Sequence, residues 1–441
     1  MASKVSLGLG KRLLAGLGAT SALALGIGAG VSAAQAAELK VMFQGDPYEI
    51  TVITDVAKRF EAANPGTTVQ LINTPHDAYN EKVGAAVSAG SLPDIMQLDA
   101  PFLANYVWSG FLQPVGGLLD KALLDDMTES NVAQGTYPID KALYAIGLTD
   151  STVALYGSRK QLEELKIRIP TSVDDAWTRD EFEAALKTLS TAPGVKWPLD
   201  LFRAYGTKTE WITYAYEPIL VSMGCDLIDR ASWKATGTLD GKACVDAATE
   251  MQNWVKQGWV VPQSSGQNQF YAEGRPAALA WGGHWFYAEA NAKMGDDVVV
   301  MPLPKFGEKG VSPNGTWIWS IAKTASDPEA AGKFLSFMLQ DPAYREAYKA
   351  HAGFPGLKSF AAESPLYADK GAMAVAFEQA GKSAVARPPH PAYPTITLAF
   401  QNAMTNIFDG ADPQDELSKA AKKIDEDIVD NDGYEPFGQP E

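Results

Sequence analysis

The first hundred residues alternate short apolar runs with amphipathic helical patterns, and this alternation constrains the fold more than any other feature. The apolar runs, each of about five residues, cover residues 39–43, 68–72 and 94–98. Between the first two runs, Val52, Ile53, Val56 and Phe60 recur at helical spacing. Strand, helix, strand, helix and strand in this order, with short connections, predict a parallel sheet covered by helices.

A sheet of this kind also predicts where a ligand binds. In open α/β sheets, ligands lie outside the carboxyl ends of the strands. The loops at that end are residues 44–46, 73–79 and 99–102. We therefore expect binding residues in these loops.

The later part of the chain shows similar elements and no linker. Thr178 and Glu181 have the spacing of a capping box before a helix, and residues 277–281 form a strand-like run that leads into Gly282-Gly283-His284-Trp285. Residues 298–301 are β-branched and extended. Because no low-complexity segment separates the two parts, we expect two lobes joined by several short crossings.

Length and charge exclude several classes of protein. A chain of 441 residues is expected to form two to three domains. Its net charge is −16, from 37 basic and 53 acidic residues. Such a chain repels the phosphate backbone unless its basic residues cluster, and no such cluster follows the first dozen positions, so we expect no nucleic-acid partner.

The amino terminus has the pattern of a secretory signal. Lys4, Lys11 and Arg12 precede an uncharged stretch that ends in Ala34-Gln35-Ala36, small residues at the spacing a signal peptidase recognises. The alternative, a permanent membrane anchor, is disfavoured because the stretch is rich in Gly, Ala and Ser. Cleavage near Ala36 removes three basic residues and no acidic ones, which changes the charge from −16 to −19. We expect a soluble protein in the periplasm.

The chain has only two cysteines, Cys225 and Cys244. In an oxidising compartment they can form a disulfide that closes a loop of about 20 residues. Two buried free thiols are the alternative.

Several segments in order resemble the extracellular solute-binding proteins of the maltose-binding type, family 1, which serve ATP-binding-cassette sugar importers. In the first part these segments are residues 60–66 (FEAANPG), 90–95 (GSLPDI) and 109–114 (SGFLQP). The similarity continues through residues 155–156, 170–182, 281–285, 302–304, 315–320 and 330–337. It covers nearly the whole chain after residue 36.

The resemblance implies an α/β fold of two lobes, each a mixed sheet flanked by helices, with three inter-lobe crossings and a ligand cleft that closes by hinge bending. By analogy, lobe 1 comprises residues 37–148 plus 301–347, and lobe 2 comprises residues 149–300 plus 348–441. The implied partners are a carbohydrate and the transmembrane permease subunits of an importer. The resemblance implies a monomeric binding protein with no catalytic residue, cofactor or metal.

Aromatic and glycine residues are the first candidates for ligand contact, because flat rings match the C–H faces of sugars. Trp285 follows a Gly-Gly turn that includes Gly283, and it matches the family's stacking position. Trp317 follows Gly315 and Thr316, where a glycine-rich turn lines the cleft in the family.

Polar candidates complete the predicted site. Asp150, in the first crossing, matches a sugar-binding glutamate of maltose-binding protein, and Asp99 follows the third strand, where the family often has a ligand-binding aspartate. Gln44 and Asp46 follow the first strand. Arg387 either bonds to hydroxyls or to an anionic group of the ligand, or forms an inter-lobe or surface salt bridge.

Other functions remain as alternatives. A secreted glycoside hydrolase needs paired carboxylates, for which Asp99 and Asp150 are the candidates. A structural or adhesive surface protein is a third class. The ligand could also be a sulfosugar, a polyol or a glycerophosphodiester. Asp430-Asn431-Asp432-Gly433 has the composition of a solvated acidic tail.

Overall fold

The computed structural model describes residues 37–45, 47–350 and 353–438. The predicted signal, residues 1–36, and the predicted ligand residue Asp46 lie outside the described residues. None of the helices in the described stretches has the length and apolarity that a bilayer crossing demands.

The first lobe is built on a five-stranded sheet that confirms the parallel start predicted from the sequence. Its strands, in spatial order, are β2 (Thr67–Asn73), β1 (Ala37–Phe43), β3 (Ile95–Asp99), β11 (Trp317–Ile321) and β4 (Ala145–Ile146). The strand β1 is parallel to both β2 and β3, whereas β11 is antiparallel to β3 and β4. The carboxyl ends of β1, β2 and β3 therefore share one edge.

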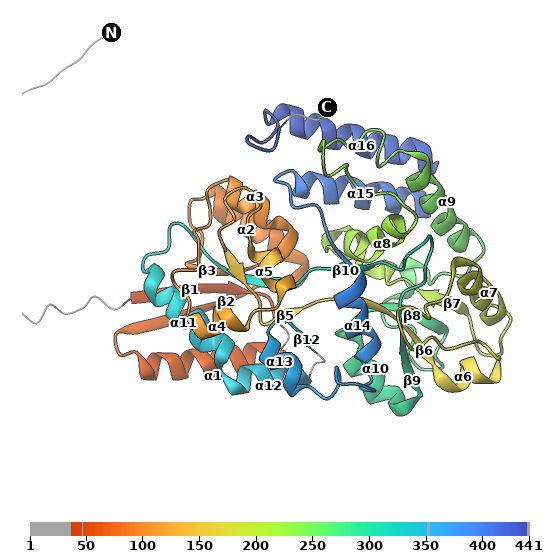
Figure 1. Cartoon of the computed structure of the whole chain (residues 1–441), viewed down its shortest axis with the longest axis horizontal. Coiled ribbons are helices and arrows are strands. Elements are labelled where there is room, and N and C mark those ends of the chain that lie inside the picture. The colour runs from red at the N-terminus through yellow and green to blue at the C-terminus, as the bar shows by residue number, and fades with distance from the viewer. Residues whose placement is uncertain (1–36, 46, 351–352, 439–441) are drawn as a thin grey trace, which may run out of the picture. The chain divides into compact units, whose positions relative to one another are not determined.

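Helices flank this sheet (Figure 1). They are α1 (Pro47–Ala63), α2 (Tyr79–Ser88), α3 (Leu103–Trp108), α4 (Lys121–Asp126), α5 (Glu129–Gly135), α11 (Pro328–Gln340), α12 (Pro342–Ala350) and α13 (Lys358–Glu363). On α1, Ile53, Val56 and Phe60 are buried, as their helical spacing predicts. The side chain of Asp327 caps α11 by accepting a hydrogen bond from the amide of Ala330 at 2.9 Å.

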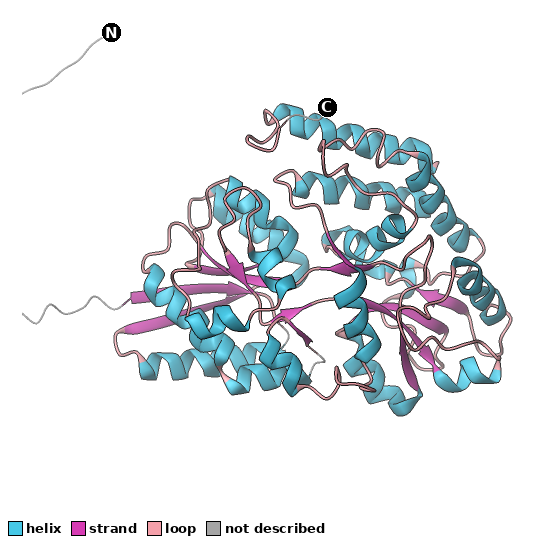
Figure 2. Cartoon of the chain, in the orientation of Figure 1, coloured by secondary structure: helices cyan, strands magenta, loops and turns pink. Residues whose placement is uncertain are grey.

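The second lobe has a mixed four-stranded sheet. In spatial order it contains β7 (Trp197–Asp200), β8 (Ala277–Gly283), β6 (Val153–Ser158) and β9 (Val298–Met301). The strand β7 is parallel to β8, and β6 is antiparallel to both β8 and β9. The sheets of the two lobes lie apart in the ribbon (Figure 2).

Eight helices are described in this lobe: α6 (Arg159–Glu164), α7 (Arg179–Leu189), α8 (Trp211–Ser222), α9 (Lys242–Lys256), α10 (Phe286–Met294), α14 (Ala374–Ser383), α15 (Tyr393–Phe408) and α16 (Pro413–Asp430). The predicted capping box of Thr178 and Glu181 begins α7.

Short 3₁₀ turns occur in both lobes, at η1 (His76–Ala78), η2 (Ala100–Phe102), η3 (Arg203–Lys208), η4 (Gln263–Ser265) and η5 (Gly295–Asp297).

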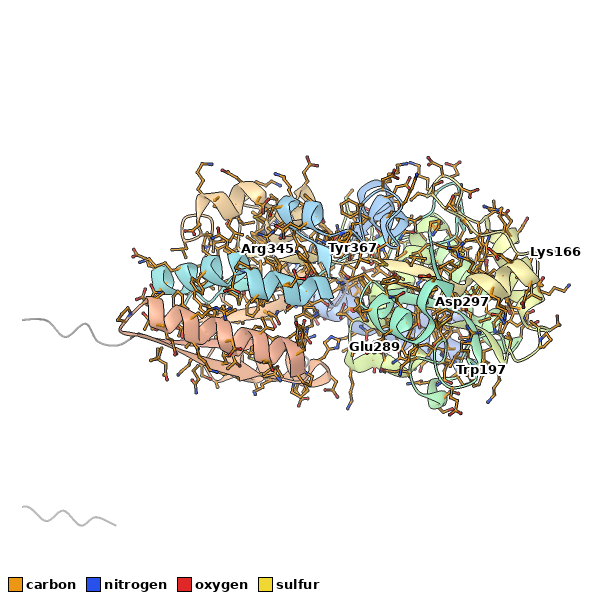
Figure 3. All side chains as sticks on the ribbon, turned by 90° about the horizontal axis from the view of Figure 1, so that it is seen from below. Lys166, Trp197, Glu289, Asp297, Arg345 and Tyr367 are labelled. Atoms are coloured by element: carbon orange, nitrogen blue, oxygen red, sulfur yellow. A yellow bond between two sulfur atoms is a disulfide. The ribbon has the colours of Figure 1, made fainter. Side chains whose placement is uncertain are left out.

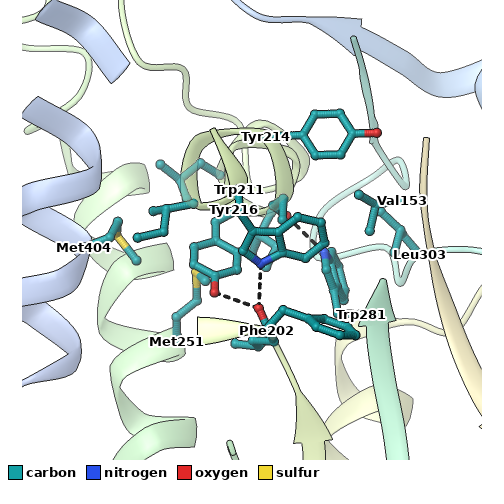
Figure 4. Packing of buried hydrophobic residues seen from close by; sticks show 14 of the residues in the cluster. Val153, Phe202, Trp211, Tyr214, Tyr216, Met251, Trp281, Leu303 and Met404 are labelled. Carbon is teal, nitrogen blue, oxygen red and sulfur yellow. Dashed lines mark hydrogen bonds between the residues drawn. The ribbon is translucent and has the colours of Figure 1, made fainter. Parts of the chain in front are cut away.

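Buried aromatic residues of the second lobe keep their polar atoms bonded (Figure 4). The Nε1 of Trp211 and the hydroxyl of Tyr216 both donate to the carbonyl of Leu201 at 2.8 Å. The Nε1 of Trp281 donates to the carbonyl of Ala215 at 3.0 Å. These bonds remove the cost of burying a polar group and fix α8 against the sheet.

Two small sheets lie between the lobes. The strand β5 (Thr149–Asp150) is antiparallel to β12 (Phe354–Pro355), and β10 (Ser312–Asn314) is parallel to β13 (Ala384–Ala386). These strands belong to the segments that connect the main sheets, near the centre of Figure 1. The architecture is the two-lobed α/β fold that the sequence predicts.

The carboxyl-terminal segment, residues 431–438, is packed against both lobes, although Asp430 and Asp432 are exposed, as predicted for a solvated acidic stretch. Tyr434 is buried, and its ring centroid lies 4.8 Å from that of Trp108 on α3. The Nε1 of Trp108 donates to the carbonyl of Glu435 at 3.0 Å. The ring of Phe437 contacts Tyr137 of the first lobe and His390 of the second. Aromatic burial therefore outweighs the solvation of the neighbouring acidic residues.

The structure joins Cys225 and Cys244, which lie 19 positions apart, by a disulfide between the end of α8 and the first turn of α9. Reduction should lower the free energy of unfolding by about 3 kcal/mol, because the open chain regains loop entropy. Urea unfolding with and without reductant measures this loss. The Cys225→Ala/Cys244→Ala variant should be equally destabilised and insensitive to reductant; an unchanged stability on reduction would contradict the prediction.

Candidate functional site

A cavity of about 410 Å³ lies between the two lobes. Its first-lobe lining comes largely from strand ends and the loops after them, and includes Gln44, His76, Gln97, Asp99 and Trp317. Its second-lobe lining lies around α8 and α10 and includes Tyr205, Glu210, Trp211, Tyr214, Trp285 and Glu289. The loops after β1, β2 and β3 thus contribute to the cavity, as the strand pattern predicts.

Trp285 and Trp317 present aromatic surface to the cavity from opposite lobes. Trp285 is 41% exposed, and its ring stacks on Tyr214 with centroids 6.1 Å apart and planes 26° apart. Trp317 is half-buried and stands edge-on to Tyr79 at 5.1 Å. Rings held by such contacts need little further ordering to stack on a ligand.

The two predicted glycines make room for these groups. A Cβ on Gly283 would lie 2.3 Å from the ring of Trp285, so only glycine lets this ring fold back over the strand end. A Cβ on Gly315 would lie 2.3 Å from Nη2 of Arg387. Arg387 is held in place because both terminal nitrogens of its guanidinium donate hydrogen bonds.

Arg387 bridges the two lobes through two carboxylates. Its Nη2 donates to Asp99 at 2.9 Å, and its Nη1 donates to Glu210 at 2.9 Å. The side chain of Arg387 is 2% exposed, and those of Asp99 and Glu210 are 9% and 10% exposed. The guanidinium also lies 5.2 Å from the ring centroid of Tyr214.

Glu210 is held by further hydrogen bonds from α15. The hydroxyls of Tyr393 and Thr397 donate to its carboxylate, as does Nε2 of Gln401 at 3.4 Å. Burial raises the pKa of Glu210, and the positive charge of Arg387 opposes this shift. Burial of the guanidinium would favour its neutral form, but the attraction of Asp99 and the other nearby groups dominates and holds the pKa of Arg387 above its ordinary value.

Asp150 lies beside the cavity and is not among its lining residues. Its carboxylate accepts hydrogen bonds from the hydroxyl of Ser130, from Nε2 of Gln134 at 3.0 Å and from the amide of Ser151 at 2.7 Å. Burial raises its pKa, and these bonds oppose the shift. Ser130 also accepts from Asn314 at 2.7 Å, so α5 is tied to two of the inter-lobe segments.

The comparisons with known proteins agree with this geometry. The family model for bacterial extracellular solute-binding proteins matches residues 47–345. The chain belongs to this family. A putative binding protein of Brucella abortus (strain 2308) is 24% identical over 424 residues, which cover 94% of this chain and 97% of the relative.

Solved structures show the same fold. The GacH receptor of Streptomyces glaucescens GLA.O superposes with a TM-score of 0.73 at 21% identity, over 89% of this chain and 99% of the receptor. An ABC transporter solute-binding protein of Thermotoga lettingae superposes with a TM-score of 0.73 at 23% identity, over 88% of this chain and 98% of that protein. The resemblance to the maltose-binding type is confirmed.

Most predicted residues of this solute-binding protein line the same cavity. They are Gln44, Asp99, Trp285, Gly315, Thr316, Trp317 and Arg387. Gly283 instead lines a second cavity of about 160 Å³ that shares Trp285, Trp211, Tyr205 and Glu289 with the first. Asp150 is occupied by hydrogen bonds outside both linings.

Sequence reasoning missed several lining residues of the solute-binding protein. Glu210 and Trp211 begin α8, Glu289 lies on α10, and Tyr344 and Tyr348 come from α12. None belongs to a motif with a spacing of its own. The only available signal was that Glu289 lies one helical turn after Trp285, on the same face of α10.

Within the described residues, no group of three or more His, Cys, Asp and Glu side chains is arranged to hold a metal ion. The cavity lining includes two histidines, His76, which is exposed, and His284, which is partly buried. Desolvation in the cavity lowers the pKa of His76 and lowers that of His284 to about 3, so both are neutral at pH 7.

Replacing Arg387 by Met should lower the free energy of unfolding by about 3 kcal/mol, because two carboxylates would remain buried without their counter-charge. The pKa of Glu210, already raised by burial, would rise further without Arg387. The loss should therefore be full at pH 8 and shrink toward pH 5, as protonation removes the unpaired charge.

Urea unfolding across this pH range tests the prediction. Arg168→Met is the matched control, since Arg168 pairs with Asp175 and Glu181 at the surface and is 40% exposed. Its loss should stay below about 1 kcal/mol at both pH values. Equal losses in the two variants would contradict a buried charge bridge.

Proposed function

We propose that the chain is the substrate-binding component of an ATP-binding-cassette importer and captures a carbohydrate in the periplasm. The observation that carries the proposal is a cavity between the lobes lined by Trp285 and Trp317 together with Asp99, Glu210 and Arg387. Flat rings and charged hydrogen-bonding groups are the combination that sugar rings require. The predicted signal, residues 1–36, supports export before delivery to the permease subunits.

Structural neighbours support a carbohydrate ligand. The GacH receptor was solved in complex with acarbose and an acarbose homolog, and the Thermotoga lettingae protein was solved with α-D-tagatose. Because their identity to this chain is low, the ligand of this chain is inferred from the chemistry of its own cavity.

Capture requires the ligand to contact both lobes, because only a difference in affinity between open and closed states shifts their equilibrium. In the proposed role, Trp317, Asp99 and Gln44 contact the ligand from the first lobe. Trp285 contacts it from the second. Asp150 acts at the hinge, where it already joins α5 to the first crossing.

The hydrophobic clusters support a division of the lobes slightly different from that expected. Leu303 and Phe306 pack with the second-lobe core, and Leu357 and Phe360 pack with the first. We place lobe 1 at residues 37–148 plus 317–363. Lobe 2 comprises residues 153–306 plus 366–438, and the residues between serve as crossings.

The hydrolase alternative receives no support from the site. Asp150 lies outside the cavity lining, so Asp99 and Asp150 do not present a catalytic pair to one substrate. Sustained release of monosaccharide from glycosides would nevertheless overturn the transport proposal.

A thermal-shift screen against a library of mono- and oligosaccharides tests the proposed function. A ligand at 100 times its dissociation constant should stabilise the protein by about 2.7 kcal/mol. The same ligand should compact the protein in solution scattering. Absence of stabilisation by every carbohydrate would contradict the proposal.

Replacing Trp285 by Ala should weaken binding of the identified sugar at least tenfold, because stacking area is lost from the centre of the cavity. The melting temperature of the empty protein should change little, since Trp285 is 41% exposed. Calorimetric titration measures the affinity. Trp108→Ala, which removes a tryptophan of similar exposure outside the cavity, should bind as the wild type; an unchanged affinity of Trp285→Ala would remove this residue from the site.

A further inference from the structure

The cavity lining carries more negative than positive charge. Among the described residues, it includes four carboxylates, from Glu49, Asp99, Glu210 and Glu289, and one guanidinium, from Arg387, and these charges add up to −3. Desolvation lowers the pKa of both lining histidines, so they add no positive charge at pH 7. The cavity as a whole therefore repels an anion.

Arg387 does not offset this excess for a ligand. Both terminal nitrogens of its buried guanidinium donate to carboxylates of the protein, one on each lobe. The Nε of Arg387 has no partner among the described residues, so a sulfate, phosphate or carboxylate on a ligand has at most this one donor. A second bond to the guanidinium would require the ligand to displace Asp99 or Glu210 and leave that carboxylate buried without its partner. The anionic alternatives are disfavoured for this reason.

Glu289 is a lining carboxylate with no ion pair among the described residues. It is exposed on α10 and lines both cavities at their junction, beside Trp285. Its hydrogen-bond partner is the neutral hydroxyl of Tyr271, and among the described residues no Lys, Arg or His forms an ion pair with it. Figure 3 shows Glu289 at the side of the second lobe that is turned toward the first.

Aromatic rings surround this carboxylate. The second cavity, of about 160 Å³, is lined by Tyr205, Trp211, Tyr271 and Trp285 as well as Glu289. The faces of aromatic rings carry negative charge density and attract a cation, whereas they repel an anion. An ammonium group near Glu289 would meet a full negative charge and aromatic faces together.

We infer that the ligand is a carbohydrate that bears a protonated amine, and that Glu289 receives the amine at the junction of the two cavities. The inference rests on the proposed function and adds the charge class of the ligand. Glu289 acts as a specificity residue: it favours the ammonium group over a hydroxyl or a carboxylate at the same position of the sugar.

Matched sets of sugars test this inference. Glucose, glucosamine and glucuronate, and the corresponding galactose and mannose sets, are titrated by calorimetry at about pH 6 in low salt. The same comparison is made with the amino and uronic analogues of any neutral carbohydrate found in the thermal-shift screen. The amine should bind at least about fivefold more tightly than the neutral sugar, and the acid should bind most weakly.

Glu289→Gln should abolish the preference, because it removes the charge and keeps a group that can bond to Tyr271. The ratio of amine to neutral affinity should fall to about one. Glu164→Gln, on α6 and outside both cavities, should keep the preference. In the wild type, added NaCl should weaken binding of the amine and leave the neutral sugar unaffected.

The outcomes separate the two proposals. Binding of neutral or acidic sugars with no gain from the amine, or a preference that survives in Glu289→Gln, overturns the inference and leaves carbohydrate capture intact. Failure of every carbohydrate to bind overturns the proposed function together with the inference.

Discussion

The buried bridge from Asp99 through Arg387 to Glu210 is the interaction on which the cleft depends. It joins the end of β3, the start of α8 and the segment before α15, which are far apart in the sequence. Further hydrogen bonds reduce the cost of burying these charges: Tyr393, Thr397 and Gln401 supply such bonds to Glu210. The Nε of Arg387 has no partner among the described residues. The bridge therefore orders both faces of the cavity and leaves room only for glycine at position 315.

A second network joins two inter-lobe crossings to α5 and lies outside the cavity lining. Ser130 on α5 bonds to Asp150 in the first crossing and to Asn314 in the second. Because both crossings are tied to one short helix of the first lobe, bending is expected to concentrate on their second-lobe side. Asp150, which matches a ligand-binding position by its resemblance to the family, thus bonds to residues of α5 and of the first crossing.

Local periodicity made the fold predictable, whereas the site depends on contacts between distant residues. The strands β1, β2 and β3, the apolar face of α1 and the capping box of α7 follow from patterns within a few residues. For Arg387 the sequence left ligand contact and a salt bridge open, and the structure shows the salt bridge within the cavity lining. Glu210 and Glu289 have no local signature, because only tertiary packing brings them there. The packing of the carboxyl-terminal segment was not predicted, because its acidic residues were weighed without Tyr434 and Phe437.

Aromatic shape and charge make different contributions to ligand recognition in the proposed cleft. Aromatic faces such as those of Trp285 and Trp317 contact the C–H face of many sugars and so contribute affinity more than selectivity. Selectivity requires groups that penalise the wrong ligand. Arg387 is a structural cation, because Asp99 and Glu210 pair with its charge. The remaining carboxylates of the lining then make the electrostatic potential of the cavity negative. Because the one guanidinium in the described lining joins the two lobes, we expect the cleft to disfavour anions without a further positive group.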